Sequence, residues 1–318
     1  MDIPSQLAKE LLKKYKASSI KAFTINIKRL LRELYNRKIY EPKYLYNTTK
    51  VKKYILNDLP KLSVQKNMTA SILAFLKADR NTPQEVLNQY QTLFKFLVKQ
   101  AEQDFKYKPA SPTEEENWIP FSNVKALQKK YQELTSDYDF SKPFTYHQKQ
   151  MYQRYLTLSL YTQIPPLRGE EYINAIIVSV SSPKLYDCLT KATQKNIMDI
   201  KHNKFVSAFY KTSSKYGTRI IDVPQSLIKI VRTWFQITGN QNLLLNLQTN
   251  QPFTQQGFTA FLNRIFEPNR ISTSMLRKIY ISEKLKTLRD PTKRKKLAYV
   301  MGHSLETQEF IYTRFKDV

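Results

Sequence analysis

Over most of this chain, apolar residues recur at steps of three and four, as one buried face of an α-helix requires. The pattern is clearest at 18–39, where the basic residues fall mostly on the other faces. It continues at 50–59, 69–77 and 83–105. The N-terminal part of the sequence therefore predicts an all-helical unit. The whole chain has only 5 glycines, which argues against a nucleotide-binding fold that depends on glycine-rich turns.

The periodicity changes in the second half of the chain. After a helical stretch that ends at Pro165 and Pro166, three short segments are rich in Val, Ile, Phe and Tyr, and the last two flank a turn-like stretch. These segments are 175–180, 204–211 and 218–223. Helical patterns surround them at 122–134, 145–161, 255–266, 273–286, 292–301 and 305–312. The predicted fold class is mainly α, with a small antiparallel β-sheet of three strands that includes a hairpin.

A chain of 318 residues is long enough for two domains. The stretch 106–120 contains three prolines and a run of three glutamates, which is the composition of a linker. We therefore expect a helical domain at 1–107, a linker at 108–120 and an α+β domain at 121–318.

The charge balance indicates a polyanionic partner. The chain has 52 Lys and Arg against 26 Asp and Glu, a formal charge of +26 that is spread along its whole length. Charge alone does not separate a specific DNA protein from one that merely adheres to nucleic acid. The basic amphipathic stretch at 1–17 could lie on a membrane, but the charge elsewhere favours DNA. No apolar run resembles a secretory signal or reaches the length of a membrane span. A DNA partner implies an intracellular protein that lies wherever its target DNA lies, and the sequence leaves the host nucleus and the cytoplasm open.

Cysteine and histidine usage argues against disulfides and metal sites. Cys188 is the single cysteine, which excludes an intramolecular disulfide and fits a reducing compartment. His147, His202 and His303 lie far apart and lack further ligands at metal-binding spacing. The sequence also has no phosphate-binding loop motif. We therefore expect neither a cofactor nor a metal.

Four separated motifs occur in a particular order. They are Pro-Leu-Arg-Gly-Glu-Glu at 166–171, the hairpin with Lys211, Ser-Met-Leu-Arg at 274–277, and Gly-His-Ser at 302–304 with Tyr312 nine residues after His303. This order and spacing resembles the catalytic domain of the tyrosine recombinases, which presents an Arg, a Lys, a His-x-x-Arg box, a Leu-Gly-His box and a terminal Tyr. The resemblance covers about 121–315.

The resemblance implies that Tyr312 attacks a DNA phosphodiester, forms a 3′-phosphotyrosyl intermediate and releases a 5′-hydroxyl. Cleavage without a metal requires cations that neutralise the charge on the non-bridging oxygens. Arg168 and Arg277 suit this role, because a guanidinium offers a planar fork of donors and keeps its charge. His303 would donate a hydrogen bond or shuttle a proton, with a buried structural histidine as the alternative reading.

The remaining candidates are less sharply defined. Lys211 is the preferred general acid for the 5′-oxygen, with Lys215 as its competitor. Glu171 resembles the family carboxylate that orients the active-site cations, and otherwise it is a surface helix charge. The sequence departs from the family at Ser274, where the third box normally begins with His. The general base is then missing, replaced by the hydroxyl, or supplied by water, and a weaker proton transfer would slow the enzyme by about a hundredfold or more.

The resemblance further implies that 1–107 is a DNA-binding clamp domain and 121–318 the catalytic domain. It also implies a homotetramer that pairs two double-stranded DNA sites. The role would be integration or excision of a viral or mobile element, with resolution of replicated genomes as the alternative. The segment 277–296, with nine basic and two acidic residues, would place positive charge beside the scissile strand. Two alternatives stay open. One is DNA relaxation by a type IB topoisomerase, which shares the nucleophile chemistry, and the other is a catalytically silent DNA-binding protein on the same fold.

Overall fold

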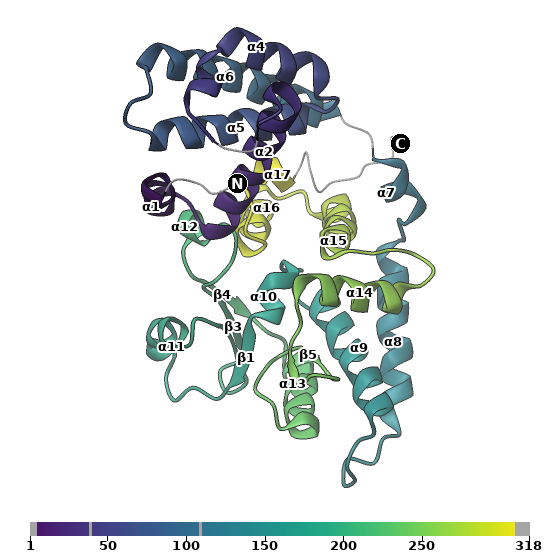
Figure 1. The fold of residues 1–318 in the computed structure, drawn as a ribbon. Helices are drawn as coiled ribbons and strands as arrows, with labels where there is room; N and C mark the ends of the chain where they lie inside the picture. Colours follow the sequence, from purple (N-terminus) through teal and green to yellow (C-terminus); the bar gives the residue numbers. More distant parts are fainter. Residues whose placement is uncertain (1–4, 38–39, 108–109, 309–318) are drawn as a thin grey trace. The chain divides into compact units, whose positions relative to one another are not determined.

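The computed structural model describes residues 5–37, 40–107 and 110–308, and the chain divides into two compact units, 1–108 and 109–318. Both units are mainly helical, and the second also contains a small sheet (Figure 1). Among the described residues, no helix has the length and apolar character needed to cross a membrane. The predicted nucleophile, Tyr312, lies outside the described residues.

The first unit is a helical bundle around α5 (Leu62–Ala78), which packs against α2 (Ala17–Tyr35) and α6 (Gln84–Tyr107). The middle of α5 is apolar on nearly every face and is buried accordingly. Asn36 ends α2 in the left-handed conformation, with a φ of 51°. The other elements of this unit are α1 (Ser5–Lys14), α3 (Lys43–Tyr46), α4 (Thr48–Lys53) and the π-helix η1 (Tyr54–Asp58).

In the second unit, helices surround the sheet. The long ones, which supply much of its core, are α8 (Phe121–Ser136), α9 (Tyr146–Thr162), α13 (Gln225–Thr238), α14 (Gln255–Phe266) and α15 (Thr273–Thr287). The shorter ones are α7 (Pro112–Glu116), α10 (Gly169–Ile173), the 3₁₀ helix η2 (Pro183–Leu185), α11 (Tyr186–Thr193), α12 (Ser213–Tyr216), α16 (Pro291–Val300) and α17 (Leu305–Thr307).

The sheet has four strands instead of the expected three. Its order is β1 (Ala175–Val178), β2 (Asn196–Asp199), β3 (Lys204–Ser207) and β4 (Arg219–Asp222). The pair β1 and β2 is parallel, and the other two pairs are antiparallel, so the sheet is mixed. The sequence reading missed β2 because all four of its residues are buried and its polar and apolar residues do not alternate. A separate two-stranded antiparallel sheet joins β5 (Leu245–Asn246) to β6 (Gln251–Pro252).

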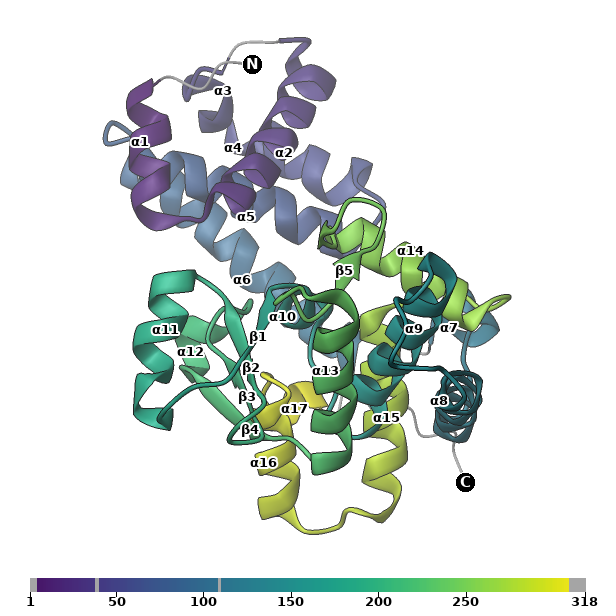
Figure 2. The ribbon, with the colours of Figure 1, turned by 90° about the horizontal axis from the view of Figure 1, so that it is seen from below.

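The two faces of the four-stranded sheet pack against different helices. Ile197 and Val206 belong to a cluster that includes Tyr186 of α11, whereas Met198 and Phe205 belong to the main core with residues of α13. Figures 1 and 2 both place the sheet between these two helices. Neighbouring residues of one strand thus face opposite sides, as the pleat requires.

The second half of the segment expected as a linker forms a short helix and packs against the second unit. Residues 112–116 form α7, and the Glu114 carboxylate accepts from the Lys278 ammonium at 2.6 Å. Trp118 and Ile119 pack against the main core of the second unit. Proline and glutamate content indicated a linker, and it carries no information on these contacts, which are made with residues distant in sequence.

The strand predicted at 204–211 ends at Ser207, so Lys211 lies in a turn and not at a strand end. The cause is Asn196, a fully buried residue of β2. Its Oδ1 accepts from the N–H groups of Ala208 at 2.9 Å and Phe209 at 2.8 Å. Its Nδ2 donates to the carbonyls of Phe209 at 3.2 Å and Glu171 at 3.1 Å. One side chain therefore takes the place of a strand partner and ties α10 to the turn that carries Lys211.

We expect Asn196→Ala to lower the free energy of unfolding of the second unit by about 3 kcal/mol, since it removes four hydrogen bonds and leaves buried backbone groups unpaired. Urea denaturation followed by tryptophan fluorescence measures this unit alone, because Trp118 and Trp234 both lie in it. Asn263→Ala, at a half-buried position of α14, is the control. A loss at position 196 no greater than in the control would contradict the assignment.

Candidate active site

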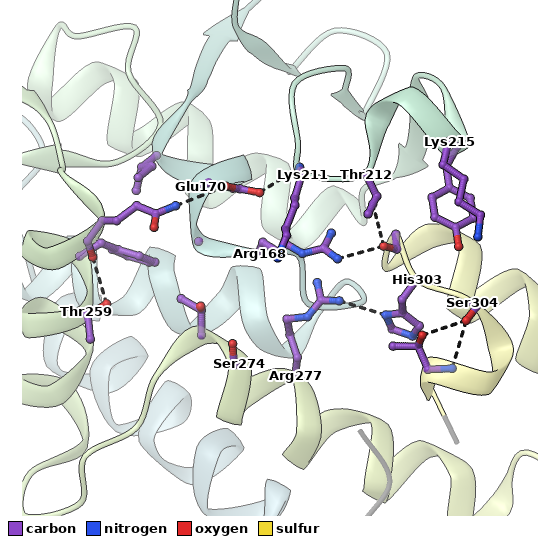
Figure 3. Close-up of a pocket in the computed structure, with 18 residues that line it drawn as sticks. Arg168, Glu170, Lys211, Thr212, Lys215, Thr259, Ser274, Arg277, His303 and Ser304 are labelled. Atoms are coloured by element: carbon purple, nitrogen blue, oxygen red, sulfur yellow. Dashed lines mark hydrogen bonds between the residues drawn. The ribbon is translucent and has the colours of Figure 1, made fainter. Parts of the chain in front are cut away.

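A pocket of about 560 Å³ in the second unit collects most of the predicted site residues that the structure describes. Its walls come from the start of α10, the turn and short helix at 211–216, α14, the start of α15 and the segment 302–307 (Figure 3). Arg168, Lys211, Ser274, Arg277 and His303 all line it.

Arg168 stands at the N-terminal edge of α10, where its N–H donates to Glu171 Oε1 at 3.1 Å. Its guanidinium reaches the segment after α16, and Nη2 donates to the Gly302 carbonyl at 3.1 Å. Nη1 is buried and has no hydrogen-bond partner among the described residues. The nearest carboxylate oxygen, Glu171 Oε1, lies 4.0 Å from Nη1. The hydrogen-bonding capacity of Nη1 is thus unused among the described residues.

Arg277 projects from α15 and is buried, with 1% of its surface exposed. Its Nη1 donates to the Pro166 carbonyl at 3.2 Å, and its Nη2 to the Met301 carbonyl at 2.8 Å. Nη2 also lies 3.0 Å from Nδ1 of His303, as Figure 3 shows. These contacts join α15 to the segments on either side of the pocket.

His303 is buried beside Arg277, and both facts bear on its protonation. Desolvation, followed by the charge of Arg277, lowers the pKa of His303 to about 3, so the ring is neutral at physiological pH. Because a guanidinium can only donate, Nδ1 is the acceptor and the ring proton sits on Nε2. Nε2 then donates to Oε1 of Gln308 at 3.3 Å. His303 presents a hydrogen-bond donor without a positive charge.

Gly302 brings the backbone close to two arginines. Its φ of 68° lies in the left-handed region, and a Cβ at this position would lie 2.9 Å from Arg219 Nη1 and 3.1 Å from Arg168 Nη1. Its carbonyl accepts from Arg168 and from the hydroxyl of Thr212 at 3.0 Å. A side chain larger than hydrogen would disturb both guanidiniums.

Both candidate lysines line the pocket. Lys211 is exposed, and its N–H donates to Glu170 Oε1 at 3.0 Å, which fixes the turn below its side chain. Lys215 belongs to α12, with its ammonium 5.4 Å from the centroid of the Tyr216 ring. The structure brings both amines to the site, and the sequence preference for Lys211 remains a prediction.

The other two candidates take different places. Ser274 is exposed on the first turn of α15, one helical turn before Arg277, and lines the pocket. Glu171 is fully buried behind Arg168 and is not a surface charge. Its Oε2 accepts from the Ser207 hydroxyl and from Arg219 Nη2.

The sequence reading missed Arg219, a third arginine beside the site. This residue of β4 is 1% exposed, and its guanidinium lies over the Tyr210 ring at 3.7 Å. A signal was present, since Arg219 shares one face of the predicted strand with Ile221 and Val223. A charged residue on an apolar face is buried only with a partner, and Glu171 provides one.

Comparison with known proteins gives a distant structural likeness. No protein-family model matches the chain, and no curated protein matches it in sequence. The crystal structure of XerA recombinase has a TM-score of 0.42 and 14% sequence identity to this chain, over 99% of this chain and 95% of that one. A likeness at this level concerns the fold alone and assigns neither residues nor activity.

The low pKa of His303 predicts a pH-dependent stability. The unfolded histidine gains a proton below about pH 6.5, whereas the folded one stays neutral to about pH 3. Folding stability due to His303 is therefore complete above pH 6.5 and is lost as the pH falls, by up to about 1.4 kcal/mol per pH unit. Urea denaturation between pH 7.5 and 4.5 should give a shallower pH dependence for His303→Gln than for the parent chain. The exposed His147→Gln should follow the parent, and identical slopes for all three proteins would refute the burial of a neutral ring.

Proposed function

We propose that this chain is a tyrosine recombinase that cleaves and rejoins double-stranded DNA through a 3′-phosphotyrosyl intermediate, in the integration or excision of a viral or mobile element. The observation that carries the proposal is the convergence of Arg168, Arg277 and His303 on one pocket. Arg168 and the Gly302 carbonyl that it contacts lie 134 residues apart in the sequence. These motifs were first identified by their order in the sequence. If their charged residues were unrelated surface residues, they would not be expected to meet in one pocket.

The pocket has the donors that phosphoryl transfer needs. The transition state spreads negative charge over the non-bridging oxygens of the phosphate, and fixed donors stabilise that charge without reorganising. Arg277 is held by two carbonyls and Arg168 by one, while Nη1 of Arg168 is left without a partner among the described residues. In this role both guanidiniums bind the scissile phosphate, and the neutral His303 ring donates to it through Nε2 in place of its Gln308 acceptor.

Tyr312 is the proposed nucleophile, and its support is the sequence spacing from His303. A free phenol has a pKa of about 10, so cations beside it would assist formation of the phenolate. The covalent bond conserves the energy of the phosphodiester, and rejoining then requires no nucleotide hydrolysis. Ser274 occupies the place of the family's histidine base, so proton removal from the phenol would depend on its hydroxyl or on water.

A basic surface adjoins the pocket along the chain. Of the basic residues in 277–296, several are exposed on α15, on α16 and in the connection between them. They are Lys284, Lys286, Arg289, Lys293, Lys295 and Lys296. Exposed lysines and arginines suit contacts with DNA phosphates. In the proposed assembly, the 1–107 unit clamps the duplex and a homotetramer pairs two sites.

Covalent attachment to DNA tests the proposal. A pool of duplexes with randomised bases around a nick serves as suicide substrate, because the short cleaved strand diffuses away and rejoining stops. The parent chain should become attached, and peptide mapping should find the nucleotide on Tyr312. Tyr312→Phe should abolish attachment, whereas Tyr299→Phe, an exposed tyrosine of α16, should not.

No attachment on any substrate would identify a silent DNA-binding protein. Attachment followed by relaxation of plasmids that carry a single site, with no exchange between two sites, would identify a topoisomerase.

The choice between Lys211 and Lys215 is tested with a substrate whose 5′-bridging oxygen is replaced by sulfur. A thiolate leaves without protonation, so the substrate no longer needs the general acid. We expect Lys211→Ala to slow attachment to normal DNA by about a hundredfold or more. The sulfur substrate should restore the rate of attachment of this variant. Lys215→Ala should have a smaller effect that sulfur does not relieve. The reverse result would assign the acid to Lys215.

A further inference from the structure

We infer that Arg219 is a positioning residue for the anion site: it holds the Glu171 carboxylate away from Arg168, so that the Arg168 guanidinium stays available for phosphate. The inference deepens the proposed function, on which it rests for the role of Arg168. Arg219 does not line the pocket itself.

The first step concerns the hydrogen-bond donors that surround the Glu171 carboxylate. Its carboxylate is fully buried and has three donors, which are the Arg168 N–H, the Ser207 hydroxyl and Arg219 Nη2. Arg219 is the cation among the three. A buried carboxylate that loses its cation takes another, because an unpaired charge in the interior is strongly disfavoured.

The second step is the distance to the competing cation. Arg168 Nη1 lies 4.0 Å from Glu171 Oε1, which is longer than the roughly 2.7–2.9 Å of a charge-assisted hydrogen bond. A shift of about an ångström would close this gap and turn the partnerless Nη1 toward the carboxylate. Glu171 would then draw the Arg168 guanidinium away from the pocket that it lines and compete with the phosphate for it.

The third step is that Arg219 is itself fixed in place. Its Nη1 donates to the Val300 carbonyl, its Nη2 also contacts the Ser207 hydroxyl at 3.1 Å, and its plane lies over the Tyr210 ring. A Cβ at Gly302 would lie 2.9 Å from Arg219 Nη1 and 3.1 Å from Arg168 Nη1, so both guanidiniums lie close to this glycine. A lysine could keep the charge beside Glu171 but not this fork of contacts.

The test measures binding of inorganic phosphate by isothermal titration calorimetry. The Arg168→Ala variant measures the background, which is the phosphate that binds elsewhere on this highly charged protein. Arg219→Met should lower the affinity above that background at least tenfold, because Glu171 then captures Arg168. Arg219→Lys should stay within about threefold of the parent. The double variant Arg219→Met/Glu171→Gln, which has no carboxylate to capture Arg168, should also return to within about threefold. Arg232→Met removes an exposed arginine of α13 and should leave the affinity unchanged.

The same variants are then assayed for the rate of attachment to nicked DNA, and they should rank in the same order. Unchanged phosphate affinity in Arg219→Met overturns the inference, as does a folded double variant that binds no better than the single one. If Arg219→Met does not fold, the double variant decides the question, because it buries no unpaired charge. A phosphate affinity of the double variant more than tenfold below that of the parent would overturn the inference. Phosphate binding by the parent without any DNA attachment would instead sink the proposed recombinase function and leave the inference standing.

Discussion

The buried carboxylate of Glu171 is the interaction on which the pocket depends. It accepts hydrogen bonds from groups of α10, β3 and β4, which are otherwise separate segments of the second unit. Removing one partner of a buried ion pair typically costs about 3–5 kcal/mol, which is a large share of the roughly 5–15 kcal/mol that stabilises a whole domain. The relative positions of these segments, and therefore of Arg168, are fixed by a contact between Glu171 and Arg219, neither of which lines the pocket.

The two pocket arginines are oriented chiefly by backbone carbonyls. The carbonyls of Pro166, Met301 and Gly302 accept from them, and the Glu171 carboxylate stays 4.0 Å from Arg168 Nη1. A carbonyl fixes the direction of a guanidinium without cancelling its charge. The site thus keeps its positive potential while its donors are preorganised, which is the arrangement that electrostatic stabilisation of an anion requires.

The sequence predicted the features that depend on local pattern. The helix at 255–266 was predicted with the bounds of α14, and the motif order pointed to Arg168, Arg277 and His303, which line one pocket. The sequence did not predict the features that depend on contacts between residues distant in the chain. Strand β2 has no alternation of polarity, the turn before Lys211 is held by Asn196, and Arg219 is explained only by Glu171. Each of these depends on partners far away in the sequence, which periodicity and composition do not encode.

The acceptors that hold the arginines have a consequence for the order in which the protein matures. The core of the first unit is complete within its own 108 residues, so this unit can fold while the ribosome is still translating the remainder. Arg168 and Arg277 emerge well before the carbonyls of Met301 and Gly302 that anchor them. The pocket arginines can therefore become ordered only after translation has passed residue 302, when the core of the first unit has already been synthesised.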